Sequence, residues 1–254
     1  MGSKHLILPD PHAHPDYNND RFEWAGKLVA DERPDHVICM GDWPDMPSLS
    51  SYDRGTRGFE GRRYSRDRDA SIDALERFHR PIRARKRKLP KFWMLKGNHD
   101  QRVDRAVDAN PYELEGIVST NDFQFKEYGW EYIDYDGSTP GIVIVDGVAY
   151  AHYFTTGVAG RANSGLHPAY SLLQKQYQSC TQGHTHTTDM CVRTNAAGNH
   201  IFGLVVGCYI DYFAEWAGEA NRLWWRGVVV CHNVENGVYE PEFISLDSIR
   251  DEYS

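Results

Sequence analysis

The chain has 254 residues and a formal net charge of -8, with 41% hydrophobic and 25% charged residues. This composition is typical of a globular protein and the length is enough to bury a substantial core, so extensive disorder and a membrane-embedded chain are both excluded. The acidic balance also argues against an extended nucleic-acid-binding surface, because affinity for the phosphate backbone comes from clustered Lys and Arg.

In the first half of the chain, short apolar runs alternate with longer amphipathic ones, which is the pattern of strand and helix units in an α/β fold. Each predicted strand runs directly into a stretch rich in Asp, His, Gly or Asn. Because open α/β sheets bind ligands at the carboxyl ends of their strands, we expect these stretches to lie close together. We predict strands at residues 5–8, 36–40 and 91–95, and helices at 20–33, 69–88 and 101–109.

The segment 46–68 fits neither pattern. It has no clear period, and it carries Gly55, Gly58 and Gly61 among six arginines. Such segments are typical of loops, and loops of this length inside a compact domain are more often functional than accidental. We therefore predict a mobile loop or lid over residues 46–68.

The second half is rich in strands, with Gly-containing turns between several of them. A strand-and-helix half followed by a strand-rich half predicts two sheets packed face to face with helices outside. The expected fold is therefore α/β (α+β), a four-layer αββα sandwich of two mixed β-sheets flanked by helices, as one domain over residues 1–254. We predict strands at 141–145, 148–151, 190–193, 201–208 and 227–231, and a helix at 168–178.

The cysteines and the apolar runs exclude several further classes. The five cysteines are an odd number, widely spaced and without a C-x-x-C pair, so neither a disulfide framework nor a thiolate zinc site is expected. No apolar run has the length of a membrane span, and the N-terminus lacks a signal-peptide pattern. We expect a cytoplasmic protein with no membrane partner, while its oligomeric state stays open.

Five short polar clusters lie at the ends of strands or strand-like runs. None is specific alone, because a D-x-H triplet or a G-x-H occurs often by chance. Together they form a set of oxygen and imidazole ligands suited to two divalent cations. The clusters are Asp10-Pro11-His12-Ala13-His14, Gly41-Asp42-Trp43-Pro44-Asp45, Gly97-Asn98-His99-Asp100, His152 and Gly183-His184-Thr185-His186.

The residue types in these clusters meet the requirements of a paired metal site. Asp42 has two carboxylate oxygens and can span two ions, which a His cannot do. Asn98 offers a neutral carbonyl oxygen, which ligates without adding negative charge to a site that must also accept an anion. Gly41, Gly97 and Gly183 are expected to allow a sharp reversal of the chain before the next side chain.

The ordered series D-x-H, G-D-x-x-D, G-N-H-D, H and G-H-x-H resembles the calcineurin-like metallophosphoesterase superfamily, and in particular its short standalone bacterial and phage members. The resemblance implies hydrolysis of phosphomonoesters or phosphodiesters by in-line attack of a metal-bound hydroxide, with two ions roughly 3.5 to 4 Å apart. We expect Mn²⁺ as the divalent metal ion, although Fe, Zn, Ni and Co suit the same ligands.

The resemblance also implies a role for each motif residue. Asp42 would bridge the two ions. His99 would face the phosphate, stabilising the transition state or protonating the leaving oxygen, while Asp45 accepts a hydrogen bond from its other ring nitrogen. Asp100 precedes a predicted helix and is expected to be its N-cap. Asp10, His12 and His186 would hold one metal, and Asn98, His152 and His184 would hold the other.

Two further groups are candidates for contact with the substrate. His14 lies two residues past a metal ligand, although a supporting role or a solvent-exposed position fits it equally well. The arginines of the 46–68 segment, Arg54, Arg57, Arg62 and Arg63, follow directly on the 41–45 turn and could grip a substrate phosphate with two hydrogen bonds each. Ordinary surface charge pairing explains these arginines equally well.

A phosphate ester, with a nucleotide among the candidates, is the substrate that the resemblance implies, and three activities stay open. The first is hydrolysis of phosphomonoesters or phosphodiesters on small molecules or nucleotides. The second is a DNA nuclease similar to the repair-exonuclease branch, which the 46–68 arginines favour and the acidic balance opposes. The third is a non-catalytic metal-binding scaffold, which the complete ligand set opposes. Met46 and Asp100 stand where the related protein phosphatases carry Arg and Glu, which argues against a phosphoprotein substrate.

Overall fold

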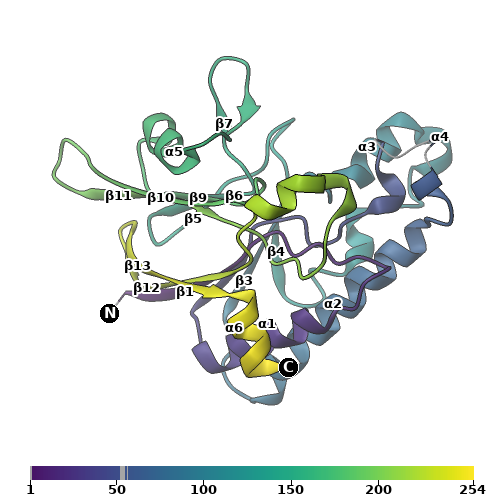
Figure 1. The fold of residues 1–254 in the computed structure, drawn as a ribbon, viewed down its shortest axis with the longest axis horizontal. Helices are drawn as coiled ribbons and strands as arrows, with labels where there is room; N and C mark the ends of the chain where they lie inside the picture. Colours follow the sequence, from purple (N-terminus) through teal and green to yellow (C-terminus); the bar gives the residue numbers. More distant parts are fainter. Residues whose placement is uncertain (1, 52–54, 56) are drawn as a thin grey trace.

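The computed structural model describes residues 2–51, 55 and 57–254. Its elements lie in four layers, with two β-sheets packed face to face and helices on both outer faces (Figure 1). The predicted four-layer αββα fold is confirmed. Among the described residues, no helix is long and apolar enough to cross a membrane.

The first sheet has six strands. Its strands β1 to β4 run parallel, whereas β12 and β13 add an antiparallel hairpin beside β1. The carboxyl ends of the four parallel strands therefore lie at one edge of the sheet. In spatial order the strands are β13 (Val238–Ser245), β12 (Gly227–Glu235), β1 (Ser3–Leu8), β2 (His36–Cys39), β3 (Lys91–Leu95) and β4 (Trp130–Ile133).

The second sheet has five strands and is also mixed. β9 runs parallel to both β11 and β6, while the outer strands β10 and β5 pair antiparallel. In spatial order the strands are β10 (Thr188–Thr194), β11 (His200–Val206), β9 (Cys180–Gln182), β6 (Val148–Ala151) and β5 (Val143–Val145). A short hairpin of β7 (Thr155–Thr156) and β8 (Arg161–Ala162) follows β6.

The core is divided into layers because successive side chains of a strand point to opposite faces of its sheet. In β1, Leu6 and Leu8 pack against the outer helices, whereas Ile7 packs against the second sheet. Both faces of this sheet are covered around β1, β2 and β3, which explains why these strands contain continuous apolar runs. The first sheet is covered by α1 (Asp20–Glu32), α2 (Tyr64–Ala84) and α6 (Leu246–Tyr253), and the second by α5 (Pro168–Gln176).

Short helices connect these layers near the edge where the parallel strands end. Two α-helices and one 3-10 helix lie between β3 and β4, and the other 3-10 helices of the described residues lie in other connections. They are α3 (Arg102–Ala109), α4 (Pro111–Leu114), η1 (Pro47–Leu49), η2 (Arg57–Phe59), η3 (Thr120–Phe123) and η4 (Glu215–Leu223).

Several elements differ from the sequence prediction. The sequence does not predict β4, β9, β13 or α6, and β9 has only three residues, too few for a periodic signal. Helix α2 begins at Tyr64 and ends at Ala84, so the last residues of the 46–68 segment predicted as a loop are helical. Residues 52–54 and 56 of that segment lie outside the described residues.

Asp67, in the first turn of α2, has a buried carboxylate in which, among the described residues, only one of the two oxygens accepts a hydrogen bond. Its side chain is 1% exposed, its Oδ2 accepts a hydrogen bond from the Ser48 N–H at 2.9 Å, and its Oδ1 has no partner among the described residues. Burial outweighs the Ser48 hydrogen bonds and raises the pKa of Asp67 from 3.8 to about 6. The folded state therefore holds a proton on Asp67 more tightly than the unfolded chain, and stability is lost as the pH rises from about 4 through 6.

We expect Asp67→Asn to increase the free energy of unfolding at pH 7.5 by about 1 to 3 kcal/mol, because each unit of pKa shift is worth about 1.4 kcal/mol and the amide can still accept from Ser48. The gain should shrink as the pH falls from 6 towards 4, where Asp67 is protonated. Urea denaturation at pH 4.5 and 7.5 measures the gain in stability and its decrease at low pH. Asp69→Asn, at an exposed position on the same helix, is the matched control, and an equal pH dependence in both variants would rule out this explanation.

Candidate metal centre

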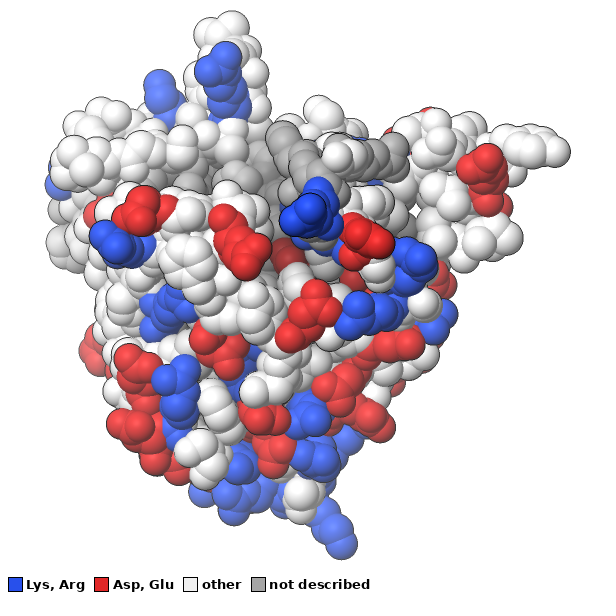
Figure 2. Space-filling model, turned by 45° about the vertical axis from the view of Figure 1, so that its right-hand side comes forward, with Lys and Arg blue, Asp and Glu red and all other residues white. Residues whose placement is uncertain are grey.

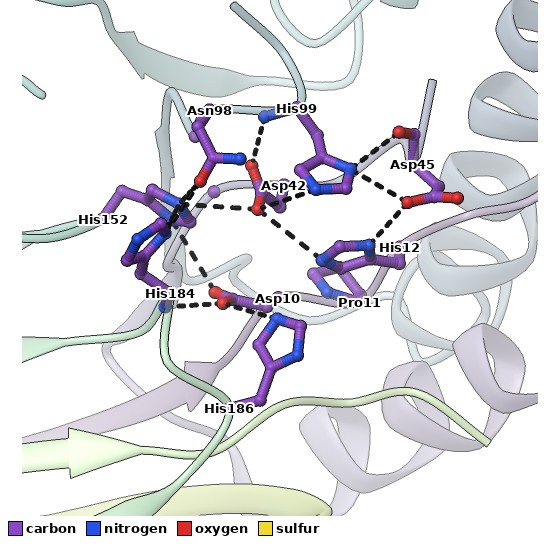
Figure 3. A network of polar contacts seen from close by, with 12 residues as sticks. Asp10, Pro11, His12, Asp42, Asp45, Asn98, His99, His152, His184 and His186 are labelled. Atoms are coloured by element: carbon purple, nitrogen blue, oxygen red, sulfur yellow. Dashed lines mark hydrogen bonds and ion pairs between the residues drawn. The ribbon is translucent and has the colours of Figure 1, made fainter. Parts of the chain in front are cut away.

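The predicted ligands meet where five strands end. Asp10, Asp42 and Asn98 follow β1, β2 and β3 of the first sheet, while His152 follows β6 of the second. His184 and His186 follow β9, which the sequence did not predict as a strand. Figure 3 shows these side chains, together with His12, turned towards one another with Asp42 near the middle.

The backbone at these positions is strained. A positive φ is uncommon for residues other than Gly, and clusters of such residues mark functional sites. Five of the seven predicted ligands have it: Asp10 (32°), His12 (46°), Asp42 (52°), His184 (69°) and His186 (59°). The packed strands around the site therefore hold these side chains in orientations that isolated loops would not favour.

The three motif positions require glycine for different structural reasons. Gly41 has a φ of 100° and provides the predicted chain reversal. Gly97 and Gly183 are not among the glycines with a positive φ, so a left-handed backbone is not the reason for them. A Cβ on Gly97 would lie 2.0 Å from Asp42 Oδ1, and one on Gly183 would lie 2.3 Å from Asp10 Oδ1. These two glycines make room for the carboxylates of neighbouring loops.

One half of the site is formed by Asp10, His12 and His186, all buried. Asp10 Oδ2 lies 3.3 Å from His186 Nε2. Asp10 Oδ1 and His12 Nε2 have no hydrogen-bond partner among the described residues. Buried polar atoms are rarely left without a partner, so these two atoms fit an arrangement that is completed by a cation.

The other half is formed by Asn98, His152 and His184. Asn98 Oδ1 lies 2.9 Å from His152 Nε2 and 2.8 Å from His184 Nδ1. His152 Nδ1 lies 2.8 Å from the Met40 carbonyl oxygen and must carry a proton to donate to it. In neutral His152 the Nε2 lone pair then faces the Asn98 oxygen, and two lone pairs face each other only where a cation or a proton lies between them.

Asp42 lies between the two halves. Its Oδ2 is 3.4 Å from His152 Nε2 and 3.6 Å from His12 Nε2, and its Oδ1 accepts from the His99 N–H at 2.7 Å. Although burial raises the pKa of Asp42, the neighbouring histidines outweigh it and hold this pKa well below its usual range. The carboxylate is therefore charged and faces both sets of nitrogen atoms.

Asp100 is not the N-cap that the sequence predicted. The residue before α3 is Gln101, which makes no side-chain cap. The buried Asp100 Oδ2 instead accepts from the backbone N–H groups of Asp42 and Gly97, each at 2.8 Å. Asp100 thus joins the loop after β2 to the loop after β3, a contact between distant segments that a local sequence pattern does not reveal.

His99 and Asp45 form a second layer of contacts beside the ligands. Asp45 Oδ1 lies 2.9 Å from His99 Nδ1 and 2.8 Å from His12 Nδ1, so one carboxylate faces two imidazoles. Burial lowers the pKa of His12, but Asp42 and Asp45 outweigh it and raise this pKa to about 10. Burial and Arg102 lower the pKa of His99.

Arg102 contacts His99 and the loop after β2, and the sequence analysis did not identify it as a site residue. Its Nη1 donates to the Asp45 and Met46 carbonyl oxygens at 2.9 and 3.2 Å, and its Nη2 lies 3.2 Å from His99 Nε2. The guanidinium is therefore fixed beside His99. Its position two residues after G-N-H-D was the available signal, but it was taken as part of a helix.

A cavity of about 960 Å³ opens beside the cluster. His14 lines it, with Nε2 3.5 Å from Asp45 Oδ2, and so does Arg62. Arg57 and Arg63 are not among its lining residues, and Arg63 donates to the Arg62 carbonyl oxygen instead. Arg54 lies outside the described residues. Residues of the lining that the sequence analysis did not single out include Tyr17, Arg66, Arg102, Tyr212 and Trp216.

The cluster offers a dense set of donor atoms for cations. Three overlapping groups among the described residues each bring their ligand atoms within 4.8 Å of one another: Asp10, His12 and His186; Asp10, Asp42 and His152; and His12, Asp42 and His99. Carboxylate and imidazole donors of this kind suit divalent transition metals. The donor set therefore fits metal ions.

A second histidine group lies away from the cavity. His5, His36 and Asp146 also approach within 4.8 Å. However, His36 Nδ1 accepts from the Trp93 indole N–H at 3.1 Å, so its Nε2 carries the proton of the neutral ring. This group is therefore a hydrogen-bonded network, and His36 Nε2 is unsuited to ligation.

A four-layer sandwich with clustered carboxylate, amide and imidazole groups at its strand ends defines the class of metal-dependent phosphoesterases. A sequence profile of the calcineurin-like phosphoesterases matches residues 4–240, and the chain belongs to that family. The family implies a phosphate ester as substrate.

Similar proteins come from phages and from a bacterium. The Gene 54 protein of Mycobacterium phage L5 is 26% identical over 228 residues, which cover 86% of this chain and 84% of that protein. The Gene 54 protein of Mycobacterium phage D29 is 25% identical over 254 residues, covering 96% and 94%. A solved structure from Streptococcus pneumoniae TIGR4, described as a conserved uncharacterized protein and predicted phosphoesterase, is 13% identical with a TM-score of 0.37, covering 96% of this chain and 90% of that one.

Proposed function

We propose that this chain is a dinuclear-metal-dependent phosphoesterase that hydrolyses phosphomonoesters or phosphodiesters. The observation that carries the proposal is the position of Asp42, whose Oδ2 lies within 3.6 Å of nitrogen atoms from both halves of the cluster. A carboxylate is the side chain that can bridge two cations. Membership of the calcineurin-like phosphoesterase family supports the same reaction class.

Each ion would have its own set of ligands, with Asp42 shared between them. The unpartnered Asp10 Oδ1 and His12 Nε2 support the first set, and the facing Asn98 and His152 acceptors support the second. Mn²⁺ is the proposed metal, and Fe, Zn, Ni and Co suit the same donors. The first set is Asp10, His12 and His186, and the second is Asn98, His152 and His184.

When bound, two divalent ions would polarise the phosphoryl oxygens and lower the pKa of the attacking water. His99 and Arg102 both line the cavity beside the cluster. Because Asp45 holds the His99 Nδ1–H, His99 would act on a substrate oxygen through Nε2, donating a proton from that atom when the ring is protonated. The Arg102 guanidinium adds a fixed positive charge where negative charge develops on the phosphoryl group.

The proposal is tested with the full chain, stripped by a chelator and reloaded with Mn²⁺. The substrates are para-nitrophenyl phosphate, its bis ester, cyclic nucleotides, and linear single- and double-stranded DNA. We expect turnover of at least one small ester, lost on chelation and restored by Mn²⁺. Activity on the bis ester alone would identify a diesterase, and DNA degradation would favour the nuclease alternative. A folded, metal-loaded chain that hydrolyses none of these substrates would contradict the proposal.

A further inference from the structure

Trp216 is an exposed aromatic side chain directly beside the candidate metal centre. It is 60% exposed and lines the cavity. Its ring centroid lies 6.3 Å from that of His99 and 6.2 Å from that of His186. Phe213 and Leu223, close to it in sequence, are also exposed. Ligand pockets are commonly lined by aromatic side chains beside a few polar groups, which is the surrounding that Trp216 has.

The segment that carries Trp216 is held in place by hydrogen bonds. The buried Asn221 side chain accepts from the Ala214 N–H at 3.0 Å and donates to the carbonyl oxygens of Ala214 and Gly218. Arg226 donates to the carbonyl oxygens of Ile210 and Tyr212 at 2.8 and 2.9 Å. Trp216 is thus presented on a braced turn, which reduces the entropy lost when a ligand stacks on it.

Other aromatic rings lie beside Trp216 or elsewhere in the cavity lining. Trp224 packs against His186 with a centroid distance of 4.3 Å and against Trp216 at 5.7 Å. Tyr17 and Tyr212 also line the cavity and are stacked, with centroids 4.0 Å apart and an angle of 4° between the rings. An inorganic or aliphatic phosphate would leave these aromatic surfaces unused.

We propose that Trp216 is a stacking platform for the base of a nucleoside phosphate whose ester group lies at the metal centre. This inference rests on the proposed function and names its substrate class. A cavity of about 960 Å³ is at the upper end of the range for small-molecule sites, so it has room for a base and sugar as well as a phosphate. Every nucleobase has an aromatic face, so one Trp accepts all four.

The charges around the cavity favour a single nucleotide or a strand end over a DNA duplex. Arg62, Arg66 and Arg102 line the cavity, but Asp16, Glu60 and Glu215 line it as well. Arg66 is already paired with Asp16 at 2.8 Å. Among the described residues in Figure 2, positive and negative side chains are interspersed and form no extended basic surface. A duplex would also keep its bases stacked on one another, away from Trp216.

The test measures binding to the Mn²⁺-loaded chain by calorimetry, with adenosine 5′-monophosphate and inorganic phosphate as the two probes. Stacking is worth about 1 to 3 kcal/mol per base, so Trp216→Ala should weaken binding of the nucleotide by about 5- to 150-fold. Binding of inorganic phosphate should change less than about twofold, because the phosphate contacts stay intact. Trp216→Phe should restore much of the nucleotide affinity, since it keeps an aromatic face.

Tyr112→Ala is the matched control, because Tyr112 is fully exposed on α4 and lies outside the cavity lining. A 5′-phosphorylated oligothymidylate, used as a third probe, shows whether the base comes from a free nucleotide or from the end of a strand. If Trp216→Ala weakens binding of the mononucleotide alone, the ligand is a free nucleotide. If it weakens binding of the oligonucleotide equally, the ligand is a strand end. Both results support the stacking role of Trp216. Equal weakening of nucleotide and phosphate in Trp216→Ala would overturn it, as would a wild-type chain that binds both probes equally.

Binding does not require turnover, so the result of the binding test is independent of whether the chain hydrolyses phosphate esters. Trp216-dependent nucleotide binding by a chain that hydrolyses no ester would leave the platform standing while the hydrolase proposal fails. In an active chain, Trp216→Ala should lower kcat/KM for nucleotide substrates by the same factor of about 5 to 150 and leave that for glycerol phosphate unchanged. An equal fall for both esters would count against the platform.

Discussion

Asp42→Asn is expected to remove bound metal and to lower kcat/KM by about 10³-fold or more, since each tenfold loss needs only about 1.4 kcal/mol of lost transition-state stabilisation. The substitution keeps the size and shape of the side chain. However, an amide has one carbonyl oxygen, and that oxygen is needed to accept the His99 N–H that Asp42 Oδ1 now accepts. The NH₂ group would then face His12 Nε2 and His152 Nε2, where a second carboxylate oxygen lies now.

Metal content, measured by elemental analysis after equilibration with Mn²⁺, and the rate of ester hydrolysis give the two readouts for Asp42→Asn. Asp247→Asn is the matched control, because Asp247 is an exposed carboxylate on α6, where its neighbour is Arg250. We expect the control to keep wild-type metal content and activity. If Asp42→Asn bound as much metal as the wild type, Asp42 would not be the bridge between the ions.

Three of the four parallel strands of the first sheet could be predicted, because each of the three is buried on both faces and therefore contains a continuous apolar run. β1, β2 and β3 are of this kind. β9, at Cys180–Gln182, is short and two of its three residues are polar, yet it carries the last metal motif. β4 has intermediate exposure at two of its four positions and lacks the uniform apolar run of its neighbours. Both strands exist because of pairing with distant partners, which local periodicity does not report.

The identity of the clustered residues could also be predicted, because metal ligation restricts the residue types and places them just after strands. Contacts that depend on the meeting of two distant loops were not predictable in the same way. Asp100 was expected to cap α3, but it binds the backbone of the loop after β2. The contact of Arg102 with the Asp45 and Met46 carbonyls depends on the same meeting of loops. Trp216 lies more than a hundred residues from His99 along the chain, and only the fold brings the two rings together.

His99→Ala is expected to lower kcat by about 10²- to 10⁴-fold, the usual contribution of a positioned proton-transfer group, and to retain both metal ions. His99 Nδ1 faces two acceptors, the Asp45 carboxylate and the Asp45 carbonyl oxygen, so the ring proton lies on Nδ1. Nε2 then carries the lone pair, which faces Arg102 Nη2 at 3.2 Å, and it lies 4.0 Å from Asp42 Oδ2, farther than His12 Nε2 or His152 Nε2. Of these three imidazoles, His99 is therefore the one farthest from Asp42.

A competing arrangement makes His99 a ligand, because His12, Asp42 and His99 also bring ligand atoms within 4.8 Å of one another. Elemental analysis of His99→Ala beside Asp42→Asn separates the two roles. If His99 acts on the substrate, metal content stays at the wild-type level, kcat falls, and added imidazole restores part of the rate. If His99→Ala loses an ion, His99 belongs to the metal set. In that case the Arg102 guanidinium, fixed 3.2 Å from His99 Nε2, would be the charged group left to face the phosphoryl oxygens.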